Sequence, residues 1–188
     1  MKQAEHPFHI EFIESFVHEK KFFCIITKFA TGGDLNKLIE DNKSVKGFKE
    51  KEALLYFAQL VLAVECMHNR DMIHRDIKPA NIFVQQNKNG IHILKLGDFG
   101  SARQDIKDAI KDKKMTNKPG SPGYWPPEII KNEPYTAKFD VWSTGVTFYE
   151  LLTGNHPFIK DVNESPQVTE TAIKETEPNI PKTLSPAT

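Results

Sequence analysis

The sequence is poor in cysteine and has no net charge. Only Cys24 and Cys66 occur among the 188 residues, and each has apolar neighbours, which indicates two unpaired buried thiols rather than a disulfide framework. We therefore expect a reducing compartment, the cytosol or the nucleus. Lysine and arginine together number 25, as do aspartate and glutamate, so no net field attracts nucleic acid or an anionic membrane surface. Neither nucleic acid nor a membrane is an expected partner.

Long apolar runs are also missing. No run approaches the roughly 20 residues that a membrane-spanning helix needs, and residues 1–5 do not resemble a secretory signal. The histidines are scattered without the spacing of metal ligands, so zinc is not predicted. Hydrophobic residues make up 39% and charged residues 27% of the chain, which is the balance of a globular protein.

Short-range patterns predict small β units and two long helices. Apolar residues alternate over 8–12 and recur over 22–26, with a turn between them, which predicts a β-hairpin. Asp34 follows two glycines and is a good N-cap for a short helix. Helical spacing of apolar residues predicts one amphipathic helix over 52–68 and a largely buried helix over 139–152.

A second hairpin is predicted between these helices, and a run of chemically active residues precedes it. Residues 82–84 and 91–96 are apolar and flank a turn that contains Asn89-Gly90, a strong hairpin signal. The run before this hairpin is His74-Arg75-Asp76-Ile77-Lys78-Pro79-Ala80-Asn81, and Asp98-Phe99-Gly100 follows it.

These two motifs resemble those of the serine/threonine protein kinases. Three further motifs stand in the family's order and spacing: Gly120-Ser121-Pro122, Pro126-Pro127-Glu128 and Asp140-Val141-Trp142-Ser143-Thr144-Gly145. Taken alone, an aspartate such as Asp76 or Asp98 is more often a turn or cap residue. The joint pattern reverses those odds, because five motifs in one order do not arise by chance.

The resemblance implies an α+β fold, the protein-kinase-like fold, mostly its helical C-terminal lobe with a residual β-hairpin and hinge from the N-terminal lobe. Residues 1–30 would be the partial N-terminal lobe, with its last two strands and hinge. Residues 31–188 would be the C-terminal lobe, truncated before its final helices. Within the family, Ile82-Phe83-Val84 and Gly32-Gly33-Asp34-Leu35 are similar to NIMA-related kinases.

The resemblance also implies a catalytic set and a metal set. Asp76 would orient the substrate hydroxyl and accept its proton, and Lys78 would reach the transferring phosphate. Ser121 stands where family members usually carry threonine, and its hydroxyl would bridge Asp76 and Lys78. Asn81 and Asp98 offer the hard oxygen ligands that Mg²⁺ prefers, beside the phosphates of ATP. A lysine two positions after the catalytic aspartate is similar to kinases that act on Ser/Thr hydroxyls of protein substrates.

Five further residues would contact the nucleotide. By resemblance, Thr27 is the gatekeeper at the end of the strand that leads to the hinge, and the backbone of Lys28 and Ala30 faces adenine. Asp34 would meet the ribose. Phe83 would form the floor under the adenine ring, although an ordinary apolar strand residue is an equally good interpretation of its position.

The sequence departs from the family in one major respect. Residues 1–188 contain no Gly-x-Gly-x-x-Gly loop and no Val-Ala-x-Lys strand, the parts of a kinase that hold the α and β phosphates. Each lost charge-assisted hydrogen bond is worth roughly 1.5 to 3 kcal/mol, so ATP binding would weaken by orders of magnitude. Three readings therefore remain open: a fragment of an active kinase, a catalytically inactive, pseudokinase-like scaffold that binds a partner protein, or a truncated gene product with no activity.

The segment 98–128 resembles a kinase activation segment, in which an upstream kinase would phosphorylate Thr116 or a neighbour. The added phosphate would pair with Arg75. We expect phosphopeptide mapping of the active protein to find a phosphate between Asp98 and Glu128. A fully unmodified segment in active protein would exclude regulation by this route.

Overall fold

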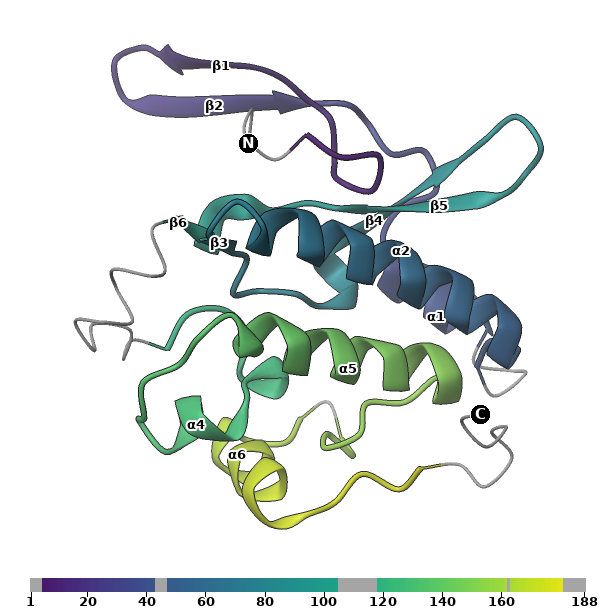
Figure 1. Cartoon of the computed structure of the whole chain (residues 1–188), viewed down its shortest axis with the longest axis vertical. Coiled ribbons are helices and arrows are strands. Elements are labelled where there is room, and N and C mark those ends of the chain that lie inside the picture. The colour runs from purple at the N-terminus through teal and green to yellow at the C-terminus, as the bar shows by residue number, and fades with distance from the viewer. Residues whose placement is uncertain (1–4, 43–46, 105–117, 162, 181–188) are drawn as a thin grey trace.

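The computed structural model describes residues 5–42, 47–104, 118–161 and 163–180. Figure 1 shows a β-hairpin at one end, a middle layer with a second hairpin and the longest helix, and a helical layer beyond it. The strands are β1 (Phe12–His18), β2 (Phe22–Thr27), β3 (Met72–Ile73), β4 (Ile82–Gln86), β5 (His92–Leu96) and β6 (Arg103–Gln104). The α-helices are α1 (Leu35–Asn42), α2 (Glu50–His68), α4 (Pro127–Ile130), α5 (Lys138–Thr153) and α6 (Pro166–Glu175). The 3₁₀ turns are η3 (Pro79–Asn81), η4 (Phe99–Ser101) and η5 (Pro122–Tyr124). This mixture of helices with small sheets is the predicted α+β class.

The first hairpin differs from its prediction at its start. β1 begins only at Phe12, whereas residues 8–10 pair with the end of β5: Leu96 N–H donates to Phe8 O and Ile10 N–H donates to Leu96 O, both at 2.8 Å. The alternation of apolar residues could not distinguish residues 8–10 from strand β1, because both segments are extended. The segment before β1 therefore ties the hairpin to the middle layer.

Both faces of the β1–β2 hairpin are exposed. Phe23 is 69% exposed and Phe29, just after β2, is 82% exposed. Cys24 in β2 is consequently half-buried, which corrects the expectation of two buried thiols, whereas Cys66 in α2 is buried. The apolar neighbours of Cys24 predicted burial, but those neighbours themselves face solvent. Cys24 and Cys66 are both free thiols, as predicted.

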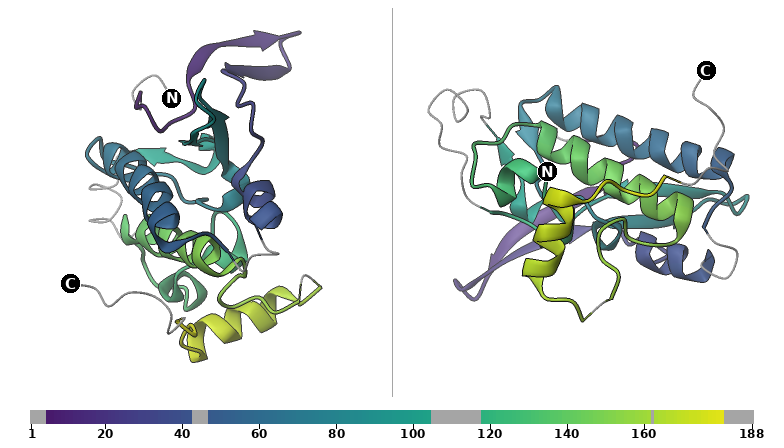
Figure 2. Two further views of the ribbon diagram at one scale, coloured as in Figure 1. Left: turned by 90° about the vertical axis from the view of Figure 1, so that its right-hand side faces the viewer. Right: turned by 90° about the horizontal axis from the view of Figure 1, so that it is seen from below.

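Helices α2 and α5 form the centre of the molecule. They lie side by side in Figure 1 and in the views of Figure 2. Phe57 of α2 stacks on Phe148 of α5 with ring centroids 4.2 Å apart. Residues such as Leu60 and Leu151 are almost fully buried, and each such side chain contributes about 1.5 to 3 kcal/mol of hydrophobic free energy. The packed helices α2 and α5 are the framework for the predicted motifs, because the 74–81 segment follows α2 and Asp140 lies in α5.

The short helix α1 is placed against β4 by two close backbone contacts. Gly32 N–H donates to Val84 O, and Val84 N–H donates to Gly33 O, both at 2.8 Å. A Cβ at Gly32 would come within 2.8 Å of Val84 O, so only glycine fits there. Asp34 Oδ1 accepts the N–H of Lys37 at 2.9 Å, which is the predicted N-cap.

Among the described residues, none of the helices is both long and apolar enough to cross a membrane. The described residues also hold no group of three or more His, Cys, Asp or Glu side chains that could bind a metal ion.

His156, in the loop after α5, is a partly buried imidazole. Its Nδ1 accepts the N–H groups of Phe158 and Ile159 at 3.1 and 3.0 Å, and its ring meets the Tyr124 ring edge-on at 5.2 Å. Burial lowers the pKa of His156 to about 4 from 6.5, partly offset by the Gly123 backbone. The folded protein therefore binds this proton less readily than the unfolded chain.

We expect this histidine to make stability depend on pH between about 4 and 6.5. In that window the unfolded state binds the proton and the folded state does not, so the free energy of unfolding falls as pH falls. In His156→Asn, whose amide oxygen can accept the same N–H groups, the loss between pH 7 and pH 4 should shrink by up to about 3 kcal/mol. Denaturant unfolding at several pH values measures this, and equal slopes in both proteins would contradict it.

Candidate active site

The segment from His74 to Asn81 is held in place by a carboxylate of α5. The fully buried Asp140 accepts the backbone N–H groups of His74 and Arg75 at 2.8 and 2.9 Å, and it also bonds His68 Nε2 at 2.8 Å. Arg75 has a φ of +68°, an unfavourable conformation for a non-glycine residue. The paired N–H contacts hold the backbone in that conformation.

Asp76 contacts three side chains, two through hydrogen bonds and one through an ion pair. Ser121 Oγ donates to Oδ1 at 2.9 Å, Asn81 Nδ2 donates to Oδ2 at 2.8 Å, and Lys78 Nζ lies 3.1 Å from Oδ2. Lys78 Nζ also donates to Ser121 Oγ at 2.7 Å, so the serine hydroxyl bridges Asp76 and Lys78. The three residues predicted as the catalytic set therefore form one hydrogen-bonded cluster.

Gly120 lets the two segments of this cluster approach each other. Its φ is +77°, and a Cβ there would lie 2.2 Å from Arg75 O and 3.1 Å from Asp76 Oδ1. Glycine is therefore required twice, by the backbone conformation and by the space available. The sequence placed this glycine in a motif but did not reveal its contact with Arg75.

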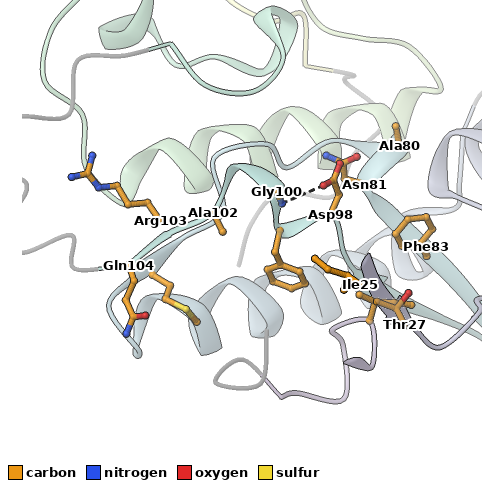
Figure 3. Close-up of a pocket in the computed structure, with 13 residues that line it drawn as sticks. Ile25, Thr27, Ala80, Asn81, Phe83, Asp98, Gly100, Ala102, Arg103 and Gln104 are labelled. Carbon is orange, nitrogen blue, oxygen red and sulfur yellow. Dashed lines mark hydrogen bonds between the residues drawn. The ribbon is translucent and has the colours of Figure 1, made fainter. Parts of the chain in front are cut away.

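The two predicted metal ligands line one cavity of about 710 Å³. Figure 3 shows Asn81 and Asp98 next to each other on its wall. Gly97 N–H donates to Asn81 O at 2.9 Å, so the backbone before Asp98 is tied to Asn81. Asp98 itself adopts the left-handed conformation, with φ 51°, and its carboxylate is exposed. An amide oxygen and a carboxylate in one cavity fit the oxygen donors that Mg²⁺ selects.

The Phe99 ring anchors the chain next to Asp98 through contacts with two histidine rings. The buried His74 packs against the Phe99 ring at 5.3 Å, and His9 meets it edge-on at 5.5 Å. His74 Nε2 also bonds Gly97 O at 2.8 Å, and burial lowers the pKa of His74. His74 therefore packs between the Phe99 ring and the Gly97 carbonyl, below the Asp98 segment.

The five predicted nucleotide contacts fall into two groups. Thr27 and Phe83 line the cavity that holds Asn81 and Asp98 (Figure 3), whereas Lys28, Ala30 and Asp34 are not among its lining residues. The Lys28 N–H donates to Glu11 O at 2.8 Å, so an adenine contact at Lys28 would use its carbonyl oxygen. Asp34 Oδ1 is engaged in capping α1. The nucleotide roles of these residues remain predictions.

The cavity also has a side that the sequence did not predict. Ile10, Ile25, Met72, Arg103 and Gln104 line it. Ile25 lies in β2, two residues before the predicted gatekeeper Thr27. Met72, Arg103 and Gln104 lie near the two predicted motifs in sequence, but no motif includes them. Thr116, the predicted phosphorylation position, lies outside the described residues.

The comparison with protein families shows to which family the chain belongs. The chain matches the family model for the protein kinase domain over residues 1–187. The chain belongs to the protein kinase family. The family match confirms the resemblance that the five motifs of this kinase chain indicated.

Individual relatives of the kinase chain narrow the family further. It is 40% identical over 158 residues to the serine/threonine-protein kinase Nek5 of Mus musculus, covering 84% of this chain and 24% of the relative. It is 37% identical over 159 residues to nekl-2 of Caenorhabditis elegans, with 81% and 42% covered, and to Nek11 of Homo sapiens, with 84% and 23% covered. The resemblance to NIMA-related kinases is thereby confirmed. The chain spans about a quarter to two fifths of the length of these curated relatives.

We expect Gly120→Ala to separate Ser121 from Asp76 in the kinase chain. The strained φ and the overlap with Arg75 O together should cost at least about 2 kcal/mol. Thermal or denaturant unfolding measures this loss.

Gly145→Ala in α5 is the matched control. A Cβ at Gly145 meets nothing within 4 Å, and alanine favours a helix over glycine by about 0.5–1 kcal/mol. This variant should be as stable as the wild type or more so. Equal losses in both variants would show that the Arg75 contact is not limiting.

Proposed function

We propose that this chain is the catalytic part of a serine/threonine protein kinase, which transfers the γ-phosphate of ATP to Ser/Thr hydroxyls of protein substrates. The observation that carries the proposal is the Asp76–Ser121–Lys78 cluster beside a cavity lined by Asn81 and Asp98. Phosphoryl transfer needs an oriented hydroxyl and neutralised phosphate oxygens, with little covalent work from the protein. These side chains supply both.

Asp76 is suited to orient an acceptor hydroxyl. Its carboxylate is kept in one position by Asn81, Ser121 and Lys78, so an incoming hydroxyl would meet a fixed acceptor. It would take the proton of that hydroxyl as the bond to phosphorus forms. Lys78 keeps a positive charge next to the same carboxylate, where it can approach a phosphate oxygen.

Asn81 and Asp98 would hold Mg²⁺ in the cavity. When bound, the ion would neutralise charge on the phosphate oxygens of ATP. The exposure of Asp98 leaves its carboxylate accessible from the cavity, and the Gly97–Asn81 backbone bond keeps the two ligands adjacent. Thr27 and Phe83, which line the same cavity, would border the adenine ring.

Lys78 and the named relatives support Ser/Thr rather than Tyr as the acceptor. Partners would be a protein substrate and an upstream kinase acting on the activation segment. The two free thiols support the cytosol or the nucleus as the site of action.

The alternative is a scaffold that binds a partner without transferring phosphate. Residues 1–188 by themselves contain no glycine-rich loop and no strand lysine, the parts that hold the α and β phosphates in the family. Against the scaffold stands the intact set of catalytic side chains in a bonded arrangement, which a pure binding module does not need.

Phosphate transfer from Mg-ATP to a serine peptide tests the proposal. We expect a protein that joins this segment to a glycine-rich loop and strand lysine to transfer phosphate, and Asp76→Asn to lower its kcat by about 10² to 10⁴. The purified 188 residues alone should transfer little. Equal rates for wild type and Asp76→Asn would reject the kinase proposal, and robust transfer by the 188 residues would show that the missing loop is dispensable.

A further inference from the structure

Arg75, next to the catalytic aspartate, connects three segments of the chain. Its backbone N–H donates to Asp140 at 2.9 Å, its Nε donates to Ser101 O at 2.7 Å, and its Nη1 donates to the Tyr135 hydroxyl at 3.0 Å. Neither side-chain partner is charged. The guanidinium is therefore held by a carbonyl and a phenol hydroxyl.

Tyr135 lies in the loop before α5 and is only 1% exposed. Its ring packs against Phe139 with centroids 5.4 Å apart, within the hydrophobic cluster that also contains Ile73 and Ile129. A ring so enclosed has little rotational freedom, because protein interiors are close-packed. The Tyr135 hydroxyl is thus a fixed point supplied by the core.

A guanidinium is planar, so fixing one of its donors constrains the directions of the others. The Tyr135 contact at Nη1 sets the plane of Arg75 and directs Nε toward Ser101 O. Ser101 ends η4, and Asp98 stands at the start of η4, where the Gly97–Asn81 bond holds the chain. Asp98 is therefore placed between two anchored points, one of which depends on Arg75.

We propose that Tyr135 is a positioning residue that acts through Arg75 and the Ser101 carbonyl to hold the Asp98 segment in its metal-binding place. Its importance for phosphoryl transfer rests on the proposed kinase function. Its effect on the Asp98 segment does not.

The variant Tyr135→Phe removes the hydroxyl and keeps the ring that fills the core. We expect amide hydrogen exchange at Ala102, which bonds Phe99 O at 3.1 Å, to become about three- to tenfold faster. The NMR resonance of Arg75 Nε–H should shift or broaden. The affinity for Mn²⁺·ADP, used as a probe of the metal site, should fall by about the same factor.

Tyr56→Phe is the matched control. Tyr56 is 5% exposed, and its hydroxyl bonds Glu52 and His92 at 3.2 Å, away from the cavity. It loses a buried hydroxyl bond as Tyr135→Phe does, so it reports the effect of a purely structural loss. We expect it to leave Ala102 exchange and Mn²⁺·ADP affinity unchanged.

A double-mutant cycle identifies the route of the effect. Arg75→Lys removes the planar fork, and adding Tyr135→Phe to it should cause no further change in Ala102 exchange. Additive effects of the two substitutions would overturn the proposal, as would a Tyr135→Phe variant that behaves like Tyr56→Phe. Because residues 1–188 contain no glycine-rich loop and no strand lysine, the Mn²⁺·ADP affinity is measured on the protein that joins this segment to those parts. If that protein binds no Mn²⁺·ADP, the proposed kinase function fails, while the exchange and Nε–H measurements still decide the role of Tyr135.

Discussion

The geometry of the site depends on one buried charge, the carboxylate of Asp140. It receives two backbone N–H groups and a histidine nitrogen, so its burial is matched by hydrogen bonds, each worth about 1.5 to 3 kcal/mol when one partner is charged. An unmatched carboxylate in this place would be strongly destabilising. The strained backbone at Arg75 is the local cost of the arrangement, and it directs Asp76 toward Ser121.

The two aspartates of the site are placed in opposite surroundings. Asp76 accepts hydrogen bonds from Ser121 and Asn81 and forms an ion pair with Lys78, and these contacts orient it and satisfy its charge. Asp98 is exposed and accepts only a long bond, 3.3 Å, from Gly100 among the contacts of its side chain that the structure describes. One carboxylate is thus fixed for orienting a small group, and the other is accessible to a cation. Asn81 serves both, because its amide nitrogen bonds Asp76 while its side chain lines the cavity of Asp98.

Local signals predicted much of the fold and of the candidate site. The Asn-Gly turn, the Asp34 cap and the helical spacing around Leu60 depend on neighbours in sequence, and the structure has each of them. The motif order also placed Ser121 beside Asp76, because the family pattern carries long-range information that periodicity does not. Features that depend on distant segments and that no motif encodes were not predicted: the pairing of residues 8–10 with β5, the bond from Arg75 to Tyr135, and the half-buried position of Cys24. Each depends on which surfaces meet, and no local propensity specifies that.

The β1–β2 hairpin has a practical consequence for work with this chain. β2 contains no charged side chain and no proline, and much of its apolar surface faces solvent. Exposed apolar strands of this kind template pairing with other chains. Purified material will therefore be limited by how concentrated it can be before it self-associates, and solubility tags or charged substitutions on the outer face of β2 are the natural remedy.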